Sequence, residues 1–303
     1  MEYIVAGYTI VNDVNFADGS SVKNFLGGSA FSVAGIRMWR DSIGYVGIAG
    51  EDFMATHGEF YNGNNIALNV EEKFPNTLHY VLDYFEDGSW QETCPEGGEY
   101  EDMVYDNSRF GADAFSKFAG PDTKGIYIEA TLNSQIVYEF DKLKAMIPNG
   151  RIMWEIFTSE LVPEKYDEVI ELIGHVDFFS INFNEAKTFF GIETLEEAIE
   201  RIQKIGKPCF FRCGDKGAYV VTPDEVTFLA SMGVEDCVDE TGCGNCSTAT
   251  SLIGLCEGLP AKETLAMANI SAMYNTKQYG PWPLVTDEVR KEVEALKEEI
   301  LKA

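Results

Sequence analysis

Positive charge and histidine are scarce in this chain. Its 303 residues contain 23 Lys and Arg against 50 Asp and Glu, a formal net charge of −27, and 3 His. A field of this sign repels phosphate backbones and anionic membrane surfaces, so neither nucleic acid nor membrane is an expected partner. Long apolar runs are also lacking. The N-terminal MEYIVAGYTIV is too short to span a bilayer and has no basic leader region, so it predicts a first buried strand of a cytoplasmic protein.

Close cysteine pairs are rare as well. The chain has seven Cys, an odd number, which favours reduced thiols over a disulfide framework. Cys243 and Cys246 have the C-x-x-C spacing of redox motifs and of half a zinc site, but a zinc site needs a second close pair. Cys209 and Cys213 are separated by three residues, and the histidines are scattered. We expect small buried thiols, and redox or zinc chemistry stays open as an alternative.

Short apolar or β-branched runs alternate with segments of helical periodicity. The runs are GIYIEA, GRIMWEI, VDFFSIN, PCFFRC and AYVVT, and the helical segments include EKYDEVIELI and TLEEAIERIQKIG. This alternation predicts an α/β fold, with a doubly wound, mostly parallel sheet flanked by helices. Residues 76–107 alternate aromatic and acidic residues around Gly turns, which predicts partly solvated antiparallel strands. The closing VRKEVEALKEEILKA predicts a charged amphipathic packing helix.

A glycine-rich turn, DETGCGN, runs directly into an apolar, helix-like segment. Gly242, Cys243 and Gly244 would place backbone N–H groups at a helix start, which is an arrangement suited to binding an anion. The turn ends in Asn245, an amide at a place where phosphate chemistry would favour a carboxylate. An ordinary glycine-rich helix entry is the alternative interpretation.

Four landmarks in order resemble the ribokinase-like sugar kinases, the PfkB family of carbohydrate and nucleoside kinases. They are GYTIVND; GGSAFSVAG followed by YVGIAGEDF; NFNE followed by RCGDKGAY; and DETGCGN leading into a helix. The resemblance covers nearly the full length and implies a single ribokinase-like domain over residues 1–303. It also implies a small β lid of strands, roughly residues 8–26 and 76–107, through which a homodimer could form.

The same resemblance implies an ATP and Mg²⁺ site. Gly242, Cys243 and Gly244 would stabilise charge on the transferring γ-phosphoryl group. Asn182 and Glu185 of NFNE would position Mg²⁺ and its waters, although both residue types also cap helices. The remaining nucleotide-side residues that it implies are Arg212, Gly214 and Gly217 near the phosphates and Asn269 and Asn275 near adenine.

The acceptor side of the resemblance is less complete. The acceptor-binding residues that it implies are Asn12 or its neighbour Asp13, Gly27, Gly28, Ser32 and Glu129. Asn12 stands where family members carry an Asp, and Ser32 stands where they usually carry an Asn. The identity of the acceptor is therefore open among sugars, sugar derivatives and nucleosides.

Asn245 occupies the catalytic position at which the family carries the Asp that accepts the acceptor's proton. A carboxamide has no useful basicity at neutral pH. Three interpretations follow: a slow kinase, a kinase whose base comes from elsewhere, or a non-catalytic ligand-binding or regulatory relative. The first two rank ahead because phosphoryl transfer relies mainly on positioning and charge stabilisation. Asp13, Glu129, Asp239 and Glu240 are the candidate substitute bases.

Overall fold

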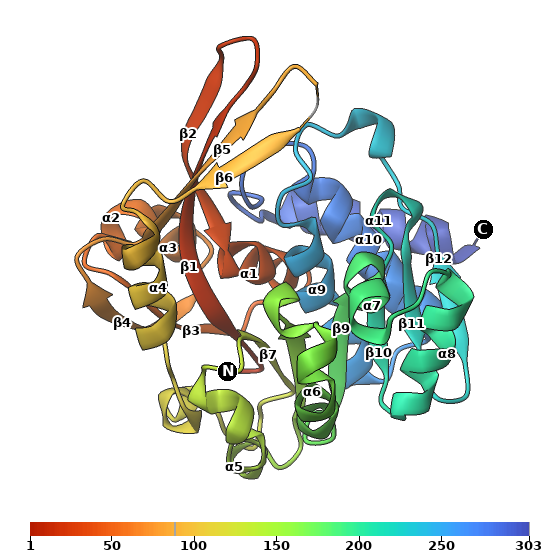
Figure 1. Cartoon of the computed structure of the whole chain (residues 1–303). Coiled ribbons are helices and arrows are strands. Elements are labelled where there is room, and N and C mark those ends of the chain that lie inside the picture. Colours follow the sequence, from red (N-terminus) through yellow and green to blue (C-terminus); the bar gives the residue numbers. More distant parts are fainter. Residues whose placement is uncertain (88, 303) are drawn as a thin grey trace.

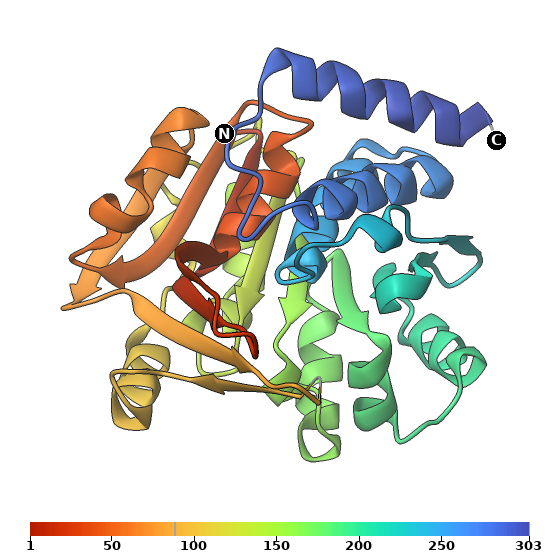
Figure 2. The same cartoon turned by 90° about the horizontal axis from the view of Figure 1, so that it is seen from above.

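One open sheet with helices on both faces organises the chain (Figure 1 and Figure 2). The computed structural model describes residues 1–87 and 89–302. Gly88, within the region of strands predicted for 76–107, and Ala303, the end of the predicted C-terminal helix, lie outside the described residues.

The strands are β1 (Tyr3–Asn15), β2 (Ser21–Gly28), β3 (Ile43–Gly50), β4 (Ala67–Phe74), β5 (Leu78–Tyr84), β6 (Trp90–Thr93), β7 (Gly125–Ala130), β8 (Arg151–Ile156), β9 (Phe178–Asn182), β10 (Cys209–Arg212), β11 (Ala218–Val221) and β12 (Val226–Leu229). The helices are α1 (Ser29–Arg37), α2 (Phe53–Thr56), α3 (Gly58–Gly63), α4 (Gly98–Asn107), α5 (Phe140–Met146), α6 (Tyr166–Ile173), α7 (Phe183–Phe190), α8 (Leu195–Ile205), α9 (Cys243–Glu257), α10 (Ala261–Asn275) and α11 (Asp287–Lys302).

The main sheet has the order β12-β11-β10-β9-β8-β7-β1-β3-β4. Neighbouring strands are parallel from β10 to β4, and β11 and β12 are added antiparallel at one edge. The doubly wound, mostly parallel sheet predicted from the sequence is therefore confirmed. The five predicted runs form β7 to β11, and the N-terminal run begins β1.

Alternate residues of each central strand contribute to separate cores on the two faces of the sheet. In β1, Ile4 and Ala6 pack into one core, whereas Tyr3 and Val5 pack into the other. The first core includes apolar residues of α5 to α8, and the second includes those of α1, α9, α10 and α11. Because side chains alternate with a period of two, every second residue of β7 and β8 also faces α9.

The strands β2, β5 and β6 project from the body together with the second half of β1 (Figure 1). We call these four segments the projecting strands. From Tyr3 to Tyr8, β1 pairs with β3 in the main sheet, and from Thr9 onward it pairs with β2 and β5. One continuous strand therefore belongs to both parts of the molecule.

The strands predicted for residues 76–107 extend only to Thr93, and residues 98–107 form helix α4 instead. Tyr100, Val104 and Tyr105 pack on the core at helical spacing, with Val104 buried. Glu99 and Glu101 stand in the first turn, where acidic side chains favour a helix start. The alternation of aromatic and acidic residues is compatible with a strand and with a helix, so this pattern alone did not distinguish the two.

The predicted C-terminal helix is present as α11, and it packs along α10 (Figure 2). Within residues 1–87 and 89–302, no helix is both long and apolar enough to cross a membrane.

Candidate active site

The glycine-rich turn enters α9 through Gly242, whose backbone is left-handed at φ 75°. A Cβ at Gly242 would lie 2.1 Å from the ring of Phe31, so both conformation and packing require glycine here. No side chain caps the helix. The N–H of Cys243 donates to the carbonyl of Glu240 at 3.1 Å. The N–H groups of Gly244 and Asn245 have no acceptor among the described residues. The turn therefore offers these two donors to a ligand, whereas the Cys243 N–H is already hydrogen-bonded.

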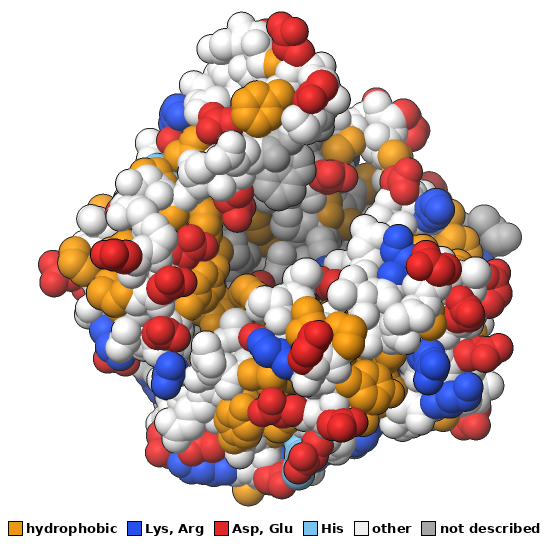
Figure 3. All heavy atoms as spheres, viewed as in Figure 1, with side chains coloured by type: hydrophobic (Ala, Val, Ile, Leu, Met, Phe, Trp, Pro, Cys, Tyr) orange, Lys and Arg blue, Asp and Glu red, His pale blue; other side chains and the backbone are white. Residues whose placement is uncertain are grey.

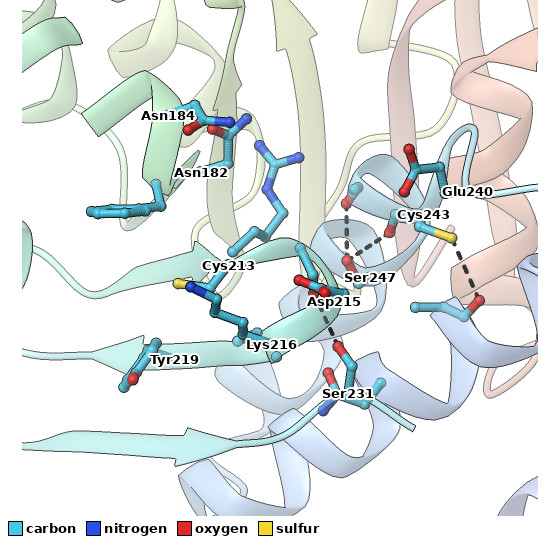
Figure 4. Close-up of a pocket in the computed structure, with 18 of the residues that line it drawn as sticks. Asn182, Asn184, Cys213, Asp215, Lys216, Tyr219, Ser231, Glu240, Cys243 and Ser247 are labelled. Atoms are coloured by element: carbon cyan, nitrogen blue, oxygen red, sulfur yellow. Dashed lines mark hydrogen bonds between the residues drawn. The ribbon is translucent and has the colours of Figure 1, made fainter. Parts of the chain in front are cut away.

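A cavity of about 1000 Å³ opens in front of this turn. Its lining includes Asn182, Arg212, Gly214, Gly217, Gly244 and Asn269. In Figure 4, Asn182 and Asn184 lie on one side of the cavity, and Cys243 and Ser247 lie at the start of α9 on another. Apolar side chains such as Met232, Val234 and Met273 also line it, so the cavity combines a polar end with an apolar one. This composition suits a ligand with a phosphate and a flat ring.

Gly214 and Gly217 form the turn between β10 and β11 at φ 60° and φ 131°. A Cβ at Gly217 would lie 2.3 Å from the carbonyl oxygen of Leu229, whereas one at Gly214 would meet nothing within 4 Å. Gly217 therefore lets the turn pack against β12, and Gly214 leaves open space in the cavity. Both residues line the cavity, and their expected position near the phosphates stays a prediction.

Asn182 and Glu185 form a reciprocal cap at the start of α7. The side chain of Asn182 accepts from the Glu185 N–H at 2.9 Å, and Glu185 accepts from the Asn182 N–H at 2.6 Å. Glu185 also accepts from the Thr158 hydroxyl at 2.7 Å and lies 3.7 Å from Arg212. The capping alternative is therefore present in the structure. Both side chains also line the cavity, so capping leaves room for a second role.

Within residues 1–87 and 89–302, no cluster of three or more His, Cys, Asp or Glu side chains could hold a metal ion. The oxygens of Glu185 are engaged in the cap and with Thr158. This donor set fits a cation that arrives with its own phosphate ligands and water, and it does not fit a metal held by the protein alone.

The two asparagines expected near adenine have different surroundings. Asn269 lines the cavity, but its amide donates to the carbonyls of Leu229 and Ala230, at 3.3 and 2.8 Å. Asn275 is buried and donates to the carbonyl of Thr241 at 2.8 Å, which fixes the glycine-rich turn from behind. Asn275 is therefore placed to support the turn rather than to form the wall of the cavity.

A charge cluster, in which Glu155 and Glu185 are buried, lies beside the turn on the α9 face of the sheet. It consists of Glu129 on β7, Glu155 on β8, Glu185 on α7 and Arg212 at the end of β10. Glu129 and Glu155 are paired in register, and the alternation of side chains directs both toward α9. Arg212 lies 3.0 Å from Glu155, and a Cβ at Gly244 would lie 2.2 Å from its guanidinium. The absence of a side chain at Gly244 therefore admits the arginine to the turn.

Asn245 contacts this cluster directly. Its Nδ2 donates to Glu129 Oε1 at 3.0 Å, and Ser29 Oγ donates to Glu129 Oε2 at 3.3 Å. Burial, reinforced by the charge of Glu155, raises the pKa of Glu129 to about 8. Burial also raises the pKa of Glu155, although Arg212 and a hydrogen bond from the Tyr127 hydroxyl oppose that effect. The site therefore keeps a carboxyl of high proton affinity next to the amide.

The remaining acceptor-side residues spread over a wider region. Asp13 lies within the projecting strands, where it accepts from the Asn24 N–H at 2.8 Å and lies 3.2 Å from Lys23. Burial opposes the effect, but these contacts lower the pKa of Asp13 below its ordinary value. Asp13 is thus held by contacts within the projecting strands. A smaller cavity of about 220 Å³, lined by Phe16 and Tyr84 among others, lies between these strands and residues 237–240. Figure 3 shows the surface hollowed beneath the projecting strands.

Asn12 is buried next to Gly27, at which a Cβ would lie 2.3 Å from the Asn12 amide nitrogen. Gly28 ends β2 just before α1 with φ 56°, and a Cβ there would lie 2.3 Å from the carbonyl oxygen of Tyr8. Ser32 is fully buried in α1, and its Oγ has no hydrogen-bond partner among the described residues, so the acceptor contact expected there stays a prediction. The neighbouring Ser29, which sequence reasoning missed, makes the contact with Glu129 instead.

Glu155 and Tyr127 were also missed. The signal for Glu155 was a single acidic residue inside the otherwise apolar run RIMWEI. A carboxylate in a strand with both faces covered is buried, and buried charges require partners. What the sequence did not supply was the register that sets Glu155 beside Glu129.

Cysteine chemistry has a clear expected result. All seven thiols are free, Cys246 is buried, and burial raises the pKa of Cys243 to about 12. Because the thiolate is the nucleophile and metal ligand, we expect Cys243 and Cys246 to remain reduced and metal-free. Mass spectrometry of the native protein with zinc analysis tests this. Stoichiometric zinc, or a Cys243–Cys246 disulfide linked to activity, would contradict the prediction.

This chain is similar to known proteins in both sequence and structure. Residues 142–286 match the model of the pfkB family carbohydrate kinases. A protein from E. coli assigned as a ribokinase II, in complex with ATP and Mg²⁺, has a TM-score of 0.76 at 16% identity, over 98% of this chain and 99% of that one. The adenosine kinase from Sinorhizobium meliloti has a TM-score of 0.73 at 19% identity, over 97% and 98%.

The Arabidopsis thaliana ribokinase, complexed with ribose and ATP, has a TM-score of 0.68 at 17% identity, over 98% of both chains. The likeness therefore extends over almost the whole of each chain, beyond the segment that the family model matches. Over almost its whole length, the chain has the fold of the ribokinase-like proteins, and it resembles the pfkB family carbohydrate kinases.

Proposed function

We propose that this protein is an ATP-dependent phosphotransferase that acts on a hydroxyl group of a sugar, sugar derivative or nucleoside. The observation that carries the proposal is the 1000 Å³ cavity at the start of α9, where the Gly244 and Asn245 N–H groups have no acceptor among the described residues. Asn245, which follows the cavity-lining Gly244, donates a hydrogen bond to Glu129, one of the residues expected on the acceptor side. The family match and the ribose, adenosine and ATP in the names of the similar structures support the substrate class.

Each part of the site has a role in this reaction. The two free N–H groups and the positive end of α9 would stabilise the negative charge of the transferring phosphoryl group. Arg212, beside Gly244, would add a positive charge at the same point. Mg²⁺ bound with the nucleotide would neutralise phosphate charge, and Asn182 and Glu185 are the residues that would hold it, through water. Asn245 cannot accept a proton, so positioning must supply much of the rate enhancement.

A non-catalytic ligand-binding relative is the second candidate, because Asn245 removes the expected base. The two candidates agree on nucleotide binding and differ on turnover. A screen of D-ribose, D-fructose and adenosine for stimulated ADP release from Mg²⁺-ATP separates them. Nucleotide binding without phosphorylation of any hydroxyl compound would favour the second candidate.

Nucleotide binding gives the first test. Mg²⁺-ATP or a non-hydrolysable analogue at millimolar concentration should raise the melting temperature, because a ligand bound only by the folded state stabilises it by mass action. Gly244→Asp should abolish this increase, since it adds a negative charge and a Cβ that collides with Arg212. Gly120→Asp is the matched control, because a Cβ there meets nothing within 4 Å. An unchanged melting curve for the wild-type protein, with a sugar also present, would count against both candidate functions.

A further inference from the structure

The chain carries an amide at the position where a proton acceptor is needed, and the structure places a carboxyl in contact with that amide. Asn245 Nδ2 lies 3.0 Å from Glu129 Oε1, and both side chains are partly exposed. We propose that Glu129 accepts the proton of the acceptor hydroxyl, with Asn245 holding its carboxylate in place. The inference rests on the proposed phosphotransferase function and assigns the base of that reaction.

None of the other three candidate carboxylates is hydrogen-bonded to Asn245 among the described residues, and Asp13 and Asp239 make contacts within their own segments. Asp13 is bound to Asn24 and Lys23 within the projecting strands. Asp239 accepts from both the N–H and the hydroxyl of Thr241, at 3.0 and 2.7 Å, and so closes its own turn. Glu240 lines both cavities but makes no hydrogen bond to Asn245 among the described residues. Only Glu129 of these four contacts the residue that replaces the expected base.

The position of Glu129 follows from the sheet. Gly7 on the neighbouring strand β1 has no side chain, and a Cβ there would lie 3.1 Å from Glu129 and 2.2 Å from Ser29 Oγ. Ser29 donates to one carboxylate oxygen and Asn245 to the other. A carboxylate oxygen can accept more than one hydrogen bond, so Glu129 keeps lone pairs for a hydroxyl while its orientation is fixed. Asn245 is thus a positioning residue.

The proposed step balances as follows. The acceptor oxygen forms a bond to the γ-phosphorus, and the bond from that phosphorus to the β-γ bridging oxygen breaks, with its electron pair leaving on ADP. The acceptor proton passes to Glu129, which later releases it to water. In a loose transition state the proton leaves late, so the base need not stand at residue 245 itself.

The electrostatics predict an unusual pH dependence. The titratable or charged groups that face Glu129 are Glu155, Arg212, Tyr127, Tyr8, Tyr45 and Tyr105. With a pKa of about 8, Glu129 is mostly protonated at neutral pH. The kcat/KM should therefore rise about tenfold per pH unit and level off above about pH 8. A base with the ordinary pKa of a carboxylate would leave the profile level down to about pH 5.

Glu129→Gln tests the assignment with D-ribose, D-fructose and adenosine as acceptors. We expect kcat to fall about 10²- to 10⁴-fold, with the acceptor KM changed only a few-fold and the Mg²⁺-ATP melting shift retained. The exchange Glu129→Gln with Asn245→Asp moves the carboxylate to residue 245 and should recover part of kcat. Asn245→Asp alone should give little gain or a loss, because two carboxylates in contact raise each other's proton affinity. Glu299→Gln, exposed on α11, is the control.

Two results would overturn the assignment: an unchanged kcat in Glu129→Gln, or a higher KM with unchanged kcat, which indicates acceptor binding alone. Carboxyl ¹³C NMR of the ligand-free protein supplies a readout independent of turnover. It should show a Glu titrating near pH 8 that is lost in Glu129→Gln and shifts to lower pH in Glu155→Gln. If no such Glu titrates, the assignment fails even if the kinase activity stands. Loss of the wild-type Mg²⁺-ATP shift would instead refute the phosphotransferase function itself.

Discussion

Arg212→Met should destabilise the protein by about 3–5 kcal/mol, because it leaves buried carboxylates without their positive partner. Arg212 lies 3.0 Å from Glu155 and 3.7 Å from Glu185, whose side chains are 7% and 6% exposed. At about 2–4 °C per kcal/mol, the melting temperature should fall by roughly 6–20 °C. Urea unfolding monitored by circular dichroism measures the change. Arg109→Met is the matched control, because its ion pair with Asp106 is exposed and should contribute under about 1 kcal/mol.

The loss caused by Arg212→Met should also depend on pH in a defined direction. Burial raises the pKa of Glu155 above its ordinary value of 4.5, and Arg212 opposes that effect, so removing Arg212 raises the pKa further. An acid whose pKa is raised on folding stabilises the fold at pH below its unfolded pKa, and this contribution is lost as pH rises through the folded pKa. The variant should therefore be least impaired near pH 4.5 and increasingly impaired above it. A small, pH-independent loss would show that the cluster is not held together by charge.

Gly242→Ala should be the second large effect, at about 2–5 kcal/mol. A left-handed backbone costs an L-residue roughly 1–2 kcal/mol, and overpacking costs about 1–3 kcal/mol more. Both apply here, because φ is 75° and the new Cβ would lie 2.1 Å from Phe31. The turn must shift to relieve the contact, so the Mg²⁺-ATP melting shift should be lost as well.

Gly191→Ala separates the two causes of that effect. Gly191 ends α7 at φ 63°, but a Cβ there meets nothing within 4 Å. It should cost only about 1 kcal/mol and leave nucleotide binding intact. Equal losses in the two variants, each measured by urea unfolding, would mean that contact with Phe31 is unimportant and that backbone strain alone fixes the turn.

The parts of this protein that were predictable from sequence are those determined by local pattern. The runs that became β7 to β11 have lengths and compositions typical of buried strands, and glycines at 214, 217 and 242 marked turns that the structure shows at positive φ. Helix α4 was mispredicted because apolar residues four apart, Tyr100 and Val104, share one face in a strand as well as in a helix. The local signal there was weaker than the tertiary packing that decided it.

The charge cluster was not predictable, because it depends on pairing between strands. Glu129 was identified through the resemblance, but its partner Glu155 lies 26 positions along the chain, in register on the next strand. Sequence spacing does not reveal which residues of two parallel strands oppose each other. Likewise, Asn245 marked the absence of a base, whereas its contact with Glu129 required the placement of α9 over the sheet.

The continuity of β1 constrains how the molecule can move. Residues Tyr3 to Tyr8 are hydrogen-bonded in the main sheet, and residues from Thr9 to Asn15 are hydrogen-bonded in the projecting strands. The two parts are therefore joined through an ordered ladder as well as by loops. A closing motion of the projecting strands that preserves these hydrogen bonds would bend and twist β1 near Thr9, and we expect the backbone amides on either side to stay protected from solvent exchange. Strand β1 would then return to its unbent shape once a ligand has left.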